Sequence, residues 1–124
     1  MALEEYVGAV VLEVDGKEVD VVEYSVTSRT GTKPVKTMNR NGRVKGFAKG
    51  IEEHELAVTV VIPKSGDLDW MAIAGAKLTD HPVSPGGQRV SYLDCYTTEV
   101  GEKYSADNEA RRDIKLFASR RVVE

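Results

Sequence analysis

The chain has 124 residues, which is enough to bury one hydrophobic core and too few for two independent ones. Hydrophobic residues make up 41% and charged residues 30% of it, a globular composition that excludes an intrinsically disordered tail. The formal net charge is -3, and no apolar run approaches the roughly 20 residues of a membrane span, so we expect no direct membrane insertion.

A β-hairpin is expected near the start of the chain. Residues 10–14 alternate apolar and other side chains with the period of a strand, and Asp15-Gly16 supplies a tight turn into a β-rich run over residues 17–26. The second run has apolar residues on both faces. This predicts that a helix or a neighbouring subunit covers part of the outer face of the sheet.

Residues 28–50 carry most of the charge asymmetry of the chain. They include seven cations and no acid, which leaves ten bases and twenty acids, or a charge of -10, for the remainder. The segment is rich in glycine and poor in large apolar residues, so we expect it to project as a long hairpin arm that turns at Asn41-Gly42. The residues expected to carry the function of this basic arm are Arg29, Lys33, Lys36, Arg40, Arg43, Lys45, Phe47 and Lys49.

Three roles are open for the basic arm: docking on an acidic protein surface, binding nucleic acid phosphates, or serving as a solvated loop. A nucleic-acid-binding domain is normally basic as a whole and interleaves aromatic residues with its cations. Phe47 is the single aromatic residue of the segment, and the rest of the chain is acidic. These features favour docking on protein over binding nucleic acid.

The middle of the chain predicts a strong strand followed by a short helix. Residues 53–62 alternate with a period of two, which is the clearest strand signal in the sequence. In the next segment Ser65 or Asp67 can cap a helix of about two turns that ends at Gly75. Such a short helix is not stable alone, so it must pack on the sheet. Its core-facing residues are expected to be Leu68, Trp70, Met71 and Ile73.

The last third of the chain also predicts strands. A β-rich run surrounds Cys95, Gly101 supplies a turn, and a short strand follows at residues 103–104. A closing strand places alternate apolar residues of the run 111–118 on one face. We therefore expect a mainly β fold, an antiparallel β-sandwich or barrel with one flanking short α-helix and the projecting arm, as a single domain over residues 1–124.

No pattern in the sequence indicates catalysis or metal binding. The acids around His54 look like a cluster, but successive residues of a strand point to opposite faces and cannot converge. Cys95 has no histidine partner at a recognisable spacing, and two histidines with one cysteine cannot build a common zinc cage. We expect neither an enzyme nor a cofactor, and Cys95 is expected in the core.

The order of these features resembles the tail tube proteins of tailed bacteriophages, more those of contractile-tailed phages than those of flexible-tailed ones. The features are the hairpin VDGKEVDVVEYSVTSRTG, the arm KPVKTMNRNGRVKGFAKG, a strand that ends at Ile62-Pro63, the segment DLDWMAIAGAK, and the strands RVSYLDCYTTEVGEKYSADNE and RRDIKLFA. The resemblance extends from Val7 to Val122 and rests on the ordered set rather than on any one motif.

The resemblance implies a structural role. Six copies would form a ring whose inner sheets join into a β-barrel around a lumen, and rings would stack head to tail, with the arm reaching the adjacent ring. It further implies that phage DNA passes through the lumen during ejection without specific binding. Partners would be a tail sheath, a baseplate or initiator protein and a terminator. The protein would be assembled in the bacterial host cytoplasm and reside in the virion tail.

Acidic residues outside the arm are candidates for receiving it or for facing the lumen; they are Glu13, Asp20, Glu55 and Glu99. Two other functions stay open. The chain could form the tube of a phage-derived device, such as a tailocin or a type VI secretion system, which shares the fold. It could also be a monomeric nucleic-acid-binding β-barrel that uses residues 29–49 on phosphates.

Overall fold

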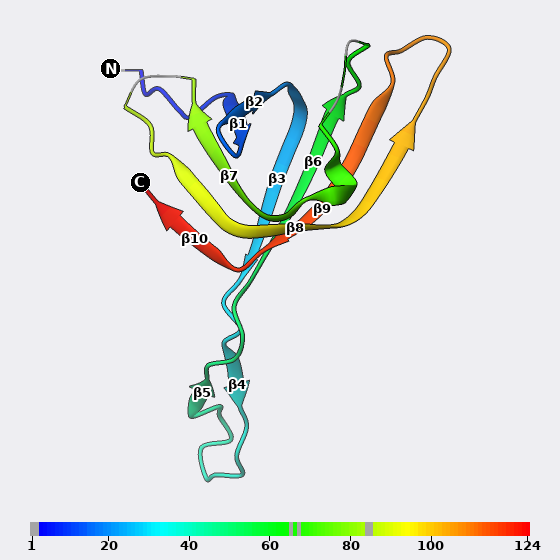
Figure 1. Ribbon diagram of the computed structural model, residues 1–124. Coiled ribbons are helices and arrows are strands. Elements are labelled where there is room, and N and C mark those ends of the chain that lie inside the picture. The colour runs from blue at the N-terminus through cyan, green and yellow to red at the C-terminus, as the bar shows by residue number, and fades with distance from the viewer. Residues whose placement is uncertain (1–2, 65, 67, 84–85) are drawn as a thin grey trace.

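The computed structural model describes residues 3–64, 66, 68–83 and 86–124, and nearly all regular structure in them is β (Figure 1). Within these residues no helix is long and apolar enough to cross a membrane. The strands are β1 (Val10–Val14), β2 (Lys17–Val19), β3 (Val21–Arg29), β4 (Lys33–Val35), β5 (Gly46–Ala48), β6 (Glu53–Val61), β7 (Ala74–Pro82), β8 (Val90–Lys103), β9 (Arg111–Ala118) and β10 (Arg120–Val123).

One curled antiparallel sheet forms the body, in the order β2-β1-β7-β8-β9-β6-β3, with β10 beside β8. The long strand β8 pairs with β7 and β10 through its first residues and with β9 through its last ones. Because β8 belongs to both halves, the sheet bends along it into the half-barrel of Figure 1. The ends of the order, β2 and β3, are joined directly at Asp20. The mainly β, antiparallel architecture predicted from the sequence is confirmed.

The core lies on the concave side of this sheet, where alternate residues of each strand are buried. In β6 the buried residues His54, Leu56, Val58 and Val60 alternate with more exposed ones, as the period of two predicts. Neighbouring β9 follows in register, with Leu116 opposite Leu56. Each fully buried aliphatic side chain contributes about 1.5–3 kcal/mol to folding. The buried apolar residues are Leu12, Val14, Leu56, Val58, Val60, Trp70, Ala76, Leu78, Tyr92, Cys95, Ile114, Leu116 and Ala118.

The prediction that Cys95 is a core residue is confirmed, and it has a testable consequence. The thiol is fully buried and donates a hydrogen bond to the Tyr92 carbonyl oxygen at 3.2 Å, and burial raises the pKa of Cys95 to about 11. Since the thiolate is the nucleophile, we expect iodoacetamide at pH 8 to leave the native protein unlabelled and to label Cys95 completely in denaturant. Mass spectrometry measures both states, and labelling of the native protein at the rate of a free thiol would contradict this assignment.

The predicted two-turn helix is wrong. A single 3-10 turn, η1 (Trp70–Ala72), stands in its place, and Ala74 already begins β7. Gly75, expected to end the helix, lies inside β7 with φ +84 at a bulge. A two-turn helix gains little by itself, whereas β7 pairs along its length with β1 and β8. Ser65 and Asp67, the expected caps, lie outside the described residues.

Three of the four residues expected on the core side of that helix are buried or half-buried, and one is exposed. Trp70 is buried at 2% exposure, and Leu68 and Ile73 are half-buried and pack against the core. Met71 is 79% exposed, so its predicted core position is wrong. In a 3-10 turn of three residues, successive side chains point in different directions, and Met71 points to solvent.

Two further predictions of local structure are wrong. The run 17–26 is interrupted at Asp20, because β2 pairs back onto β1 while β3 leaves to pair with β6. Gly101 is not in a turn but within β8, opposite Asp113 of β9. The hairpin between β1 and β2, with Asp15 and Gly16 at φ 52 and 83, is confirmed.

Candidate assembly surfaces

The arm, defined from here as residues 30–52, leaves the body between β3 and β6. Its strands β4 and β5 form a separate two-stranded sheet, and Figure 1 shows it projecting away from the curled sheet, on the side opposite the N-terminus. The tip turns at residues 39–42: the Asn39 side chain accepts a hydrogen bond from the Asn41 amide at 3.1 Å and donates one to the Arg43 carbonyl at 2.8 Å. Gly42 closes the turn with φ +62.

The two chains of the arm approach each other closely at its root. The Gly50 amide donates a hydrogen bond to the Gly31 carbonyl at 2.9 Å. A Cβ added to Gly31, where φ is +76, would lie 2.3 Å from the Ile51 carbonyl oxygen, and one added to Gly50 would lie 2.6 Å from the Gly31 oxygen. No side chain fits at either position. The direction in which the arm leaves the body is therefore set by a backbone crossing that requires glycine.

Gly31→Ala is expected to lower the free energy of unfolding by about 2–4 kcal/mol, because the methyl group would overlap backbone atoms that cannot rotate away. Gly42→Ala is the matched control: it also has a positive φ, but its Cβ would meet nothing within 4 Å, so we expect a loss of about 1 kcal/mol. Urea unfolding measures both values. Equal losses would show that the crossing at the root does not constrain the fold.

A buried histidine lies beside this root. His54 is 2% exposed, and its Nδ1 and Nε2 atoms lie 2.8 Å from the Ser28 hydroxyl and 3.1 Å from the Glu52 carboxylate. Its ring lies 6.0 Å from that of Tyr92. Strand alternation separates neighbours, but Glu52 and His54 are two residues apart and do meet. With both nitrogens in use, this group ties β3, β6 and the root of the arm together.

The described residues offer no site for metal chemistry. No group of three or more His, Cys, Asp or Glu side chains in the described part of the chain could hold a metal ion. Ser28, His54 and Glu52 have the residue types of a hydrolase triad. The five cavities described for residues of this part of the chain are lined by other residues than Ser28 and His54.

The cations of the arm have no partners within the described part of their own subunit. Of the predicted arm cations, Arg29 lies at the end of β3 and pairs with Glu53 at 3.7 Å and Glu55 at 3.4 Å. The other six form no ion pair with any described residue: Lys33, Lys36, Arg40, Arg43, Lys45 and Lys49. The arm also exposes large apolar side chains, namely Val35, Met38, Val44, Phe47 and Ile51. Exposed apolar groups beside unpaired charge are typical of a binding surface.

Among the strand edges that have no partner in the described structure, two bound the same section of the body. One is the edge of β3 away from β6, and the other is the edge of β8 over residues 98–103, away from β9. They bound a four-stranded section, β3-β6-β9-β8. Because neighbours in it are antiparallel and the strand number is even, its two edge strands run in opposite directions. The outer face of this section carries Glu23, Ser25, Thr27, Arg29, Glu53, Glu55, Ala57, Thr59, Val61, Tyr96, Glu99, Gly101, Lys103, Arg111, Asp113, Lys115 and Phe117.

The four candidate acids do not form one patch. Glu55 and Glu99 share the outer face of the four-stranded section, where Glu55 pairs with Arg29 and Glu99 lies 3.8 Å from Lys115. Glu13 lies on β1 in the other half of the sheet, and Asp20 is exposed at the corner between β2 and β3. The structure therefore brings together only Glu55 and Glu99.

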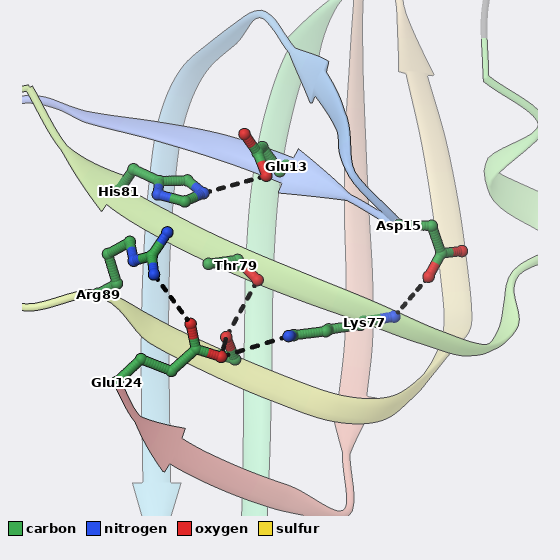
Figure 2. A network of polar contacts seen from close by, with 8 residues as sticks. Glu13, Asp15, Lys77, Thr79, His81, Arg89 and Glu124 are labelled. Carbon is green, nitrogen blue, oxygen red and sulfur yellow. Dashed lines mark hydrogen bonds and ion pairs between the residues drawn. The ribbon is translucent and has the colours of Figure 1, made fainter.

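The outer side of the other half-sheet carries a polar network that the sequence does not reveal (Figure 2). The Glu124 carboxylate accepts a hydrogen bond from the buried Ser91 hydroxyl at 2.9 Å and pairs with Lys77 at 3.3 Å and Arg89 at 3.6 Å. Hydrogen bonds from Ser91 and Lys77 lower the pKa of Glu124. Nearby, Glu13 lies 3.1 Å from His81. These contacts attach the end of β10 to β7 and β8.

Glu124→Gln is expected to speed amide exchange in β10 by roughly two- to fivefold at pH 7, because the exposed ion pairs are lost. Because the pKa of Glu124 is lower in the folded than in the unfolded state, the ionised carboxylate stabilises the folded state at pH values above 4.5. This stabilisation is lost as the pH falls through the folded-state pKa, so the difference between the wild type and the variant should vanish at that pH. Hydrogen-exchange NMR compares the two proteins. The control is Glu109→Gln, whose carboxylate pairs with Arg111 at the start of β9; this change should leave β10 unchanged.

No family model matches the sequence, and no curated protein matches it either. Solved structures do match. The sheath/tube terminator of the PVC extracellular contractile injection system, in its extended state, superposes with a TM-score of 0.78 and 13% identity over 99% of each chain. The tube-terminating cap of the anti-feeding prophage gives a TM-score of 0.76 and 11% identity over 100% of this chain and 94% of that one.

A chain of the PVC sheath–tube complex, also in the extended state, superposes with a TM-score of 0.73 and 13% identity over 93% of this chain and 87% of that one. Such low identity over nearly full length means that the likeness lies in the arrangement of strands. The chain therefore has the fold of tube and tube-terminator proteins of contractile injection systems.

Proposed function

We propose that this chain is a structural subunit of the tube of a phage-like tail, acting as a single domain that forms rings and stacks them through its arm. The observation that carries the proposal is the arm itself. It projects from the body, exposes six cations without ion pairs among the described residues, and exposes apolar side chains between them. The rest of the chain is acidic, so a second copy is a complementary partner.

Ring formation follows from the two unpaired edges of the four-stranded section. The edge of β3 and the edge of β8 over residues 98–103 run in opposite directions, so β3 of one copy can continue the antiparallel sheet of the next. Repeated head to tail, this pairing closes a ring and removes edges that would otherwise invite aggregation. The tube-protein resemblance supports a hexameric ring.

In such a ring the outer face of the four-stranded section lines the lumen, because the opposite face is buried in the core. This face mixes small polar residues with charges, and Glu55 and Glu99 on it are already paired with Arg29 and Lys115. A lining with nearly balanced charge has little affinity for the DNA backbone. It supports passage of DNA without specific binding, in a virion tail whose other parts are a sheath, an initiator and a terminator.

A terminal ring is the second candidate, and one comparison favours it. The two terminating proteins superpose over 99% and 100% of this chain, against 93% for the chain of the sheath–tube complex. In that role the ring would still form, but the arm would dock on the last ring of a different tube protein.

Negative-stain electron microscopy of the purified protein, with native mass spectrometry, separates these functions. A tube subunit should give stacked rings at moderate concentration, and a terminator should give single rings that do not elongate. A solitary monomer that binds a short DNA duplex, with an affinity that falls steeply as salt rises, would overturn the proposal in favour of a nucleic-acid-binding barrel.

A further inference from the structure

The N-terminal segment, residues 3–8, is an exposed apolar strip that carries two acids. It has no regular secondary structure, and the side chains of Leu3, Tyr6 and Val7 are 100%, 78% and 74% exposed. Between them lie Glu4 and Glu5, which form no ion pair with any described residue. A monomer gains nothing from exposing three large apolar side chains in one short segment, so this strip has the character of a binding surface.

A shallow groove runs beside this strip. The residues that line it are Glu5, Tyr6, Val7, Gly8, Pro82, Gly86 and Gly87. The segment is attached to the body at its end, where the Val83 amide donates a hydrogen bond to the Ala9 carbonyl at 3.1 Å. The groove combines apolar side chains with the carboxylate of Glu5. It therefore suits a binding segment that presents apolar and cationic side chains together.

The arm is such a segment, and it lies at the opposite end of the molecule. Figure 1 shows the N-terminus at the end of the body away from the arm. Complementary surfaces at opposite ends of one chain cannot meet within a subunit, but they do meet between copies related by a translation. Repetition of that contact produces a stack.

Several other acids of the body are less suited to receive the arm because they already form ion pairs within their own subunit. Glu55 pairs with Arg29, Glu99 with Lys115, and Glu124 with Lys77. The corner between β2 and β3 carries the acids Glu18 and Asp20 without ion pairs to described residues, but Lys17 lies in the same groove. The N-terminal strip combines uncompensated acid with the larger exposed apolar surface.

We propose that the arm of one copy docks on residues 3–8 of a copy in the next ring. Met38, which is fully exposed at the tip of the arm, supplies an adaptable apolar side chain for the groove, and Lys36 and Arg40 face the carboxylates of Glu4 and Glu5. This inference rests on the proposed stacking of rings and identifies the surface that receives the arm.

A charge-swap experiment tests it. The variant Glu4→Lys/Glu5→Lys should form rings but raise the critical concentration for tubes at least tenfold in 50 mM salt. Combining it with Lys36→Glu/Arg40→Glu should restore tubes toward the wild-type concentration, because both sides of the contact are then reversed. The matched control is Glu18→Lys/Asp20→Lys, which makes the same change of charge at the corner between β2 and β3 and should stack as the wild type does.

The outcomes distinguish this inference from the function on which it rests. Normal tubes from Glu4→Lys/Glu5→Lys, together with loss of tubes on removal of the arm, would show that the arm docks elsewhere and would overturn only the inference. Loss of tubes in the control at the corner would move the acceptor there. A wild-type protein that forms neither rings nor tubes would overturn both.

Discussion

Deleting residues 33–45 is expected to leave a folded body that forms rings but no tubes. None of the buried apolar residues lies in that range, and β4 and β5 pair only with each other among the described strands. The crossing of Gly31 and Gly50 remains, so a short connection still joins β3 to β6. We expect the circular dichroism spectrum and melting temperature to change little, while electron microscopy shows single rings.

The effect on stacking is large because a ring multiplies the contribution of each copy. If each arm contributed about 1 kcal/mol, a hexameric ring would lose about 6 kcal/mol, which corresponds to a factor of roughly 10⁴ in the stacking equilibrium. Long tubes from the deletion variant would refute the role assigned to the arm. An unfolded variant would show instead that the arm supports the body, and Gly31→Ala would then be expected to destabilise it comparably.

Those parts of the fold that depend on local pattern could be predicted from the sequence. The strand β6 follows from its alternation, and the turn between β1 and β2 follows from Asp15-Gly16, both of which adopt positive φ. The arm follows from composition, because a segment with seven cations and few large apolar residues cannot be buried. Each of these is determined by residues close together in the chain.

Elements determined by distant partners could not be predicted. Residues 70–76 place apolar side chains at helical spacing, but only residues 70–72 form a 3-10 turn, and pairing with β8 makes residues 74–76 the start of a strand with a bulge at Gly75. Gly101 is compatible with a turn by itself and is held extended by Asp113 across the ladder. The contacts of Glu124 with Lys77 and Arg89 join residues far apart in sequence, and no local signal marks them.

The candidate surfaces likewise depend partly on local sequence and partly on contacts between residues far apart in the chain. Composition identifies the cations of the arm, but strand register is needed to place Glu55 and Glu99 on one face and Glu13 on another. The unpaired edges of β3 and β8 become visible only once every other strand has its partner. The N-terminal strip is short, and no pattern in residues 3–8 predicts a binding surface. The role we propose for it depends on where the fold places it relative to the arm.

Reversing Lys36, Arg40 and Arg43 to Glu should weaken tube formation most at low salt. The change alters each arm by six charge units, and screening over about 10 Å at 0.1 M salt shortens to about 3 Å at 1 M. At about 0.2–1 kcal/mol for each exposed pair, we expect the critical concentration to rise at least tenfold at 50 mM salt. At 1 M salt the rise should fall below roughly threefold, because the apolar side chains of the arm still contribute.

The matched control reverses three exposed cations outside the arm, Lys64, Arg120 and Arg121, and so changes the net charge of the chain equally. Sedimentation across a salt series measures the critical concentration of each variant. If the control lost tubes as readily as the arm variant, net charge and not the arm would govern assembly. If neither salt nor the arm reversal changed the critical concentration, apolar packing would be the force that stacks the rings. Substitution of Met38 and Phe47 would then be expected to raise the critical concentration more than the charge reversal does.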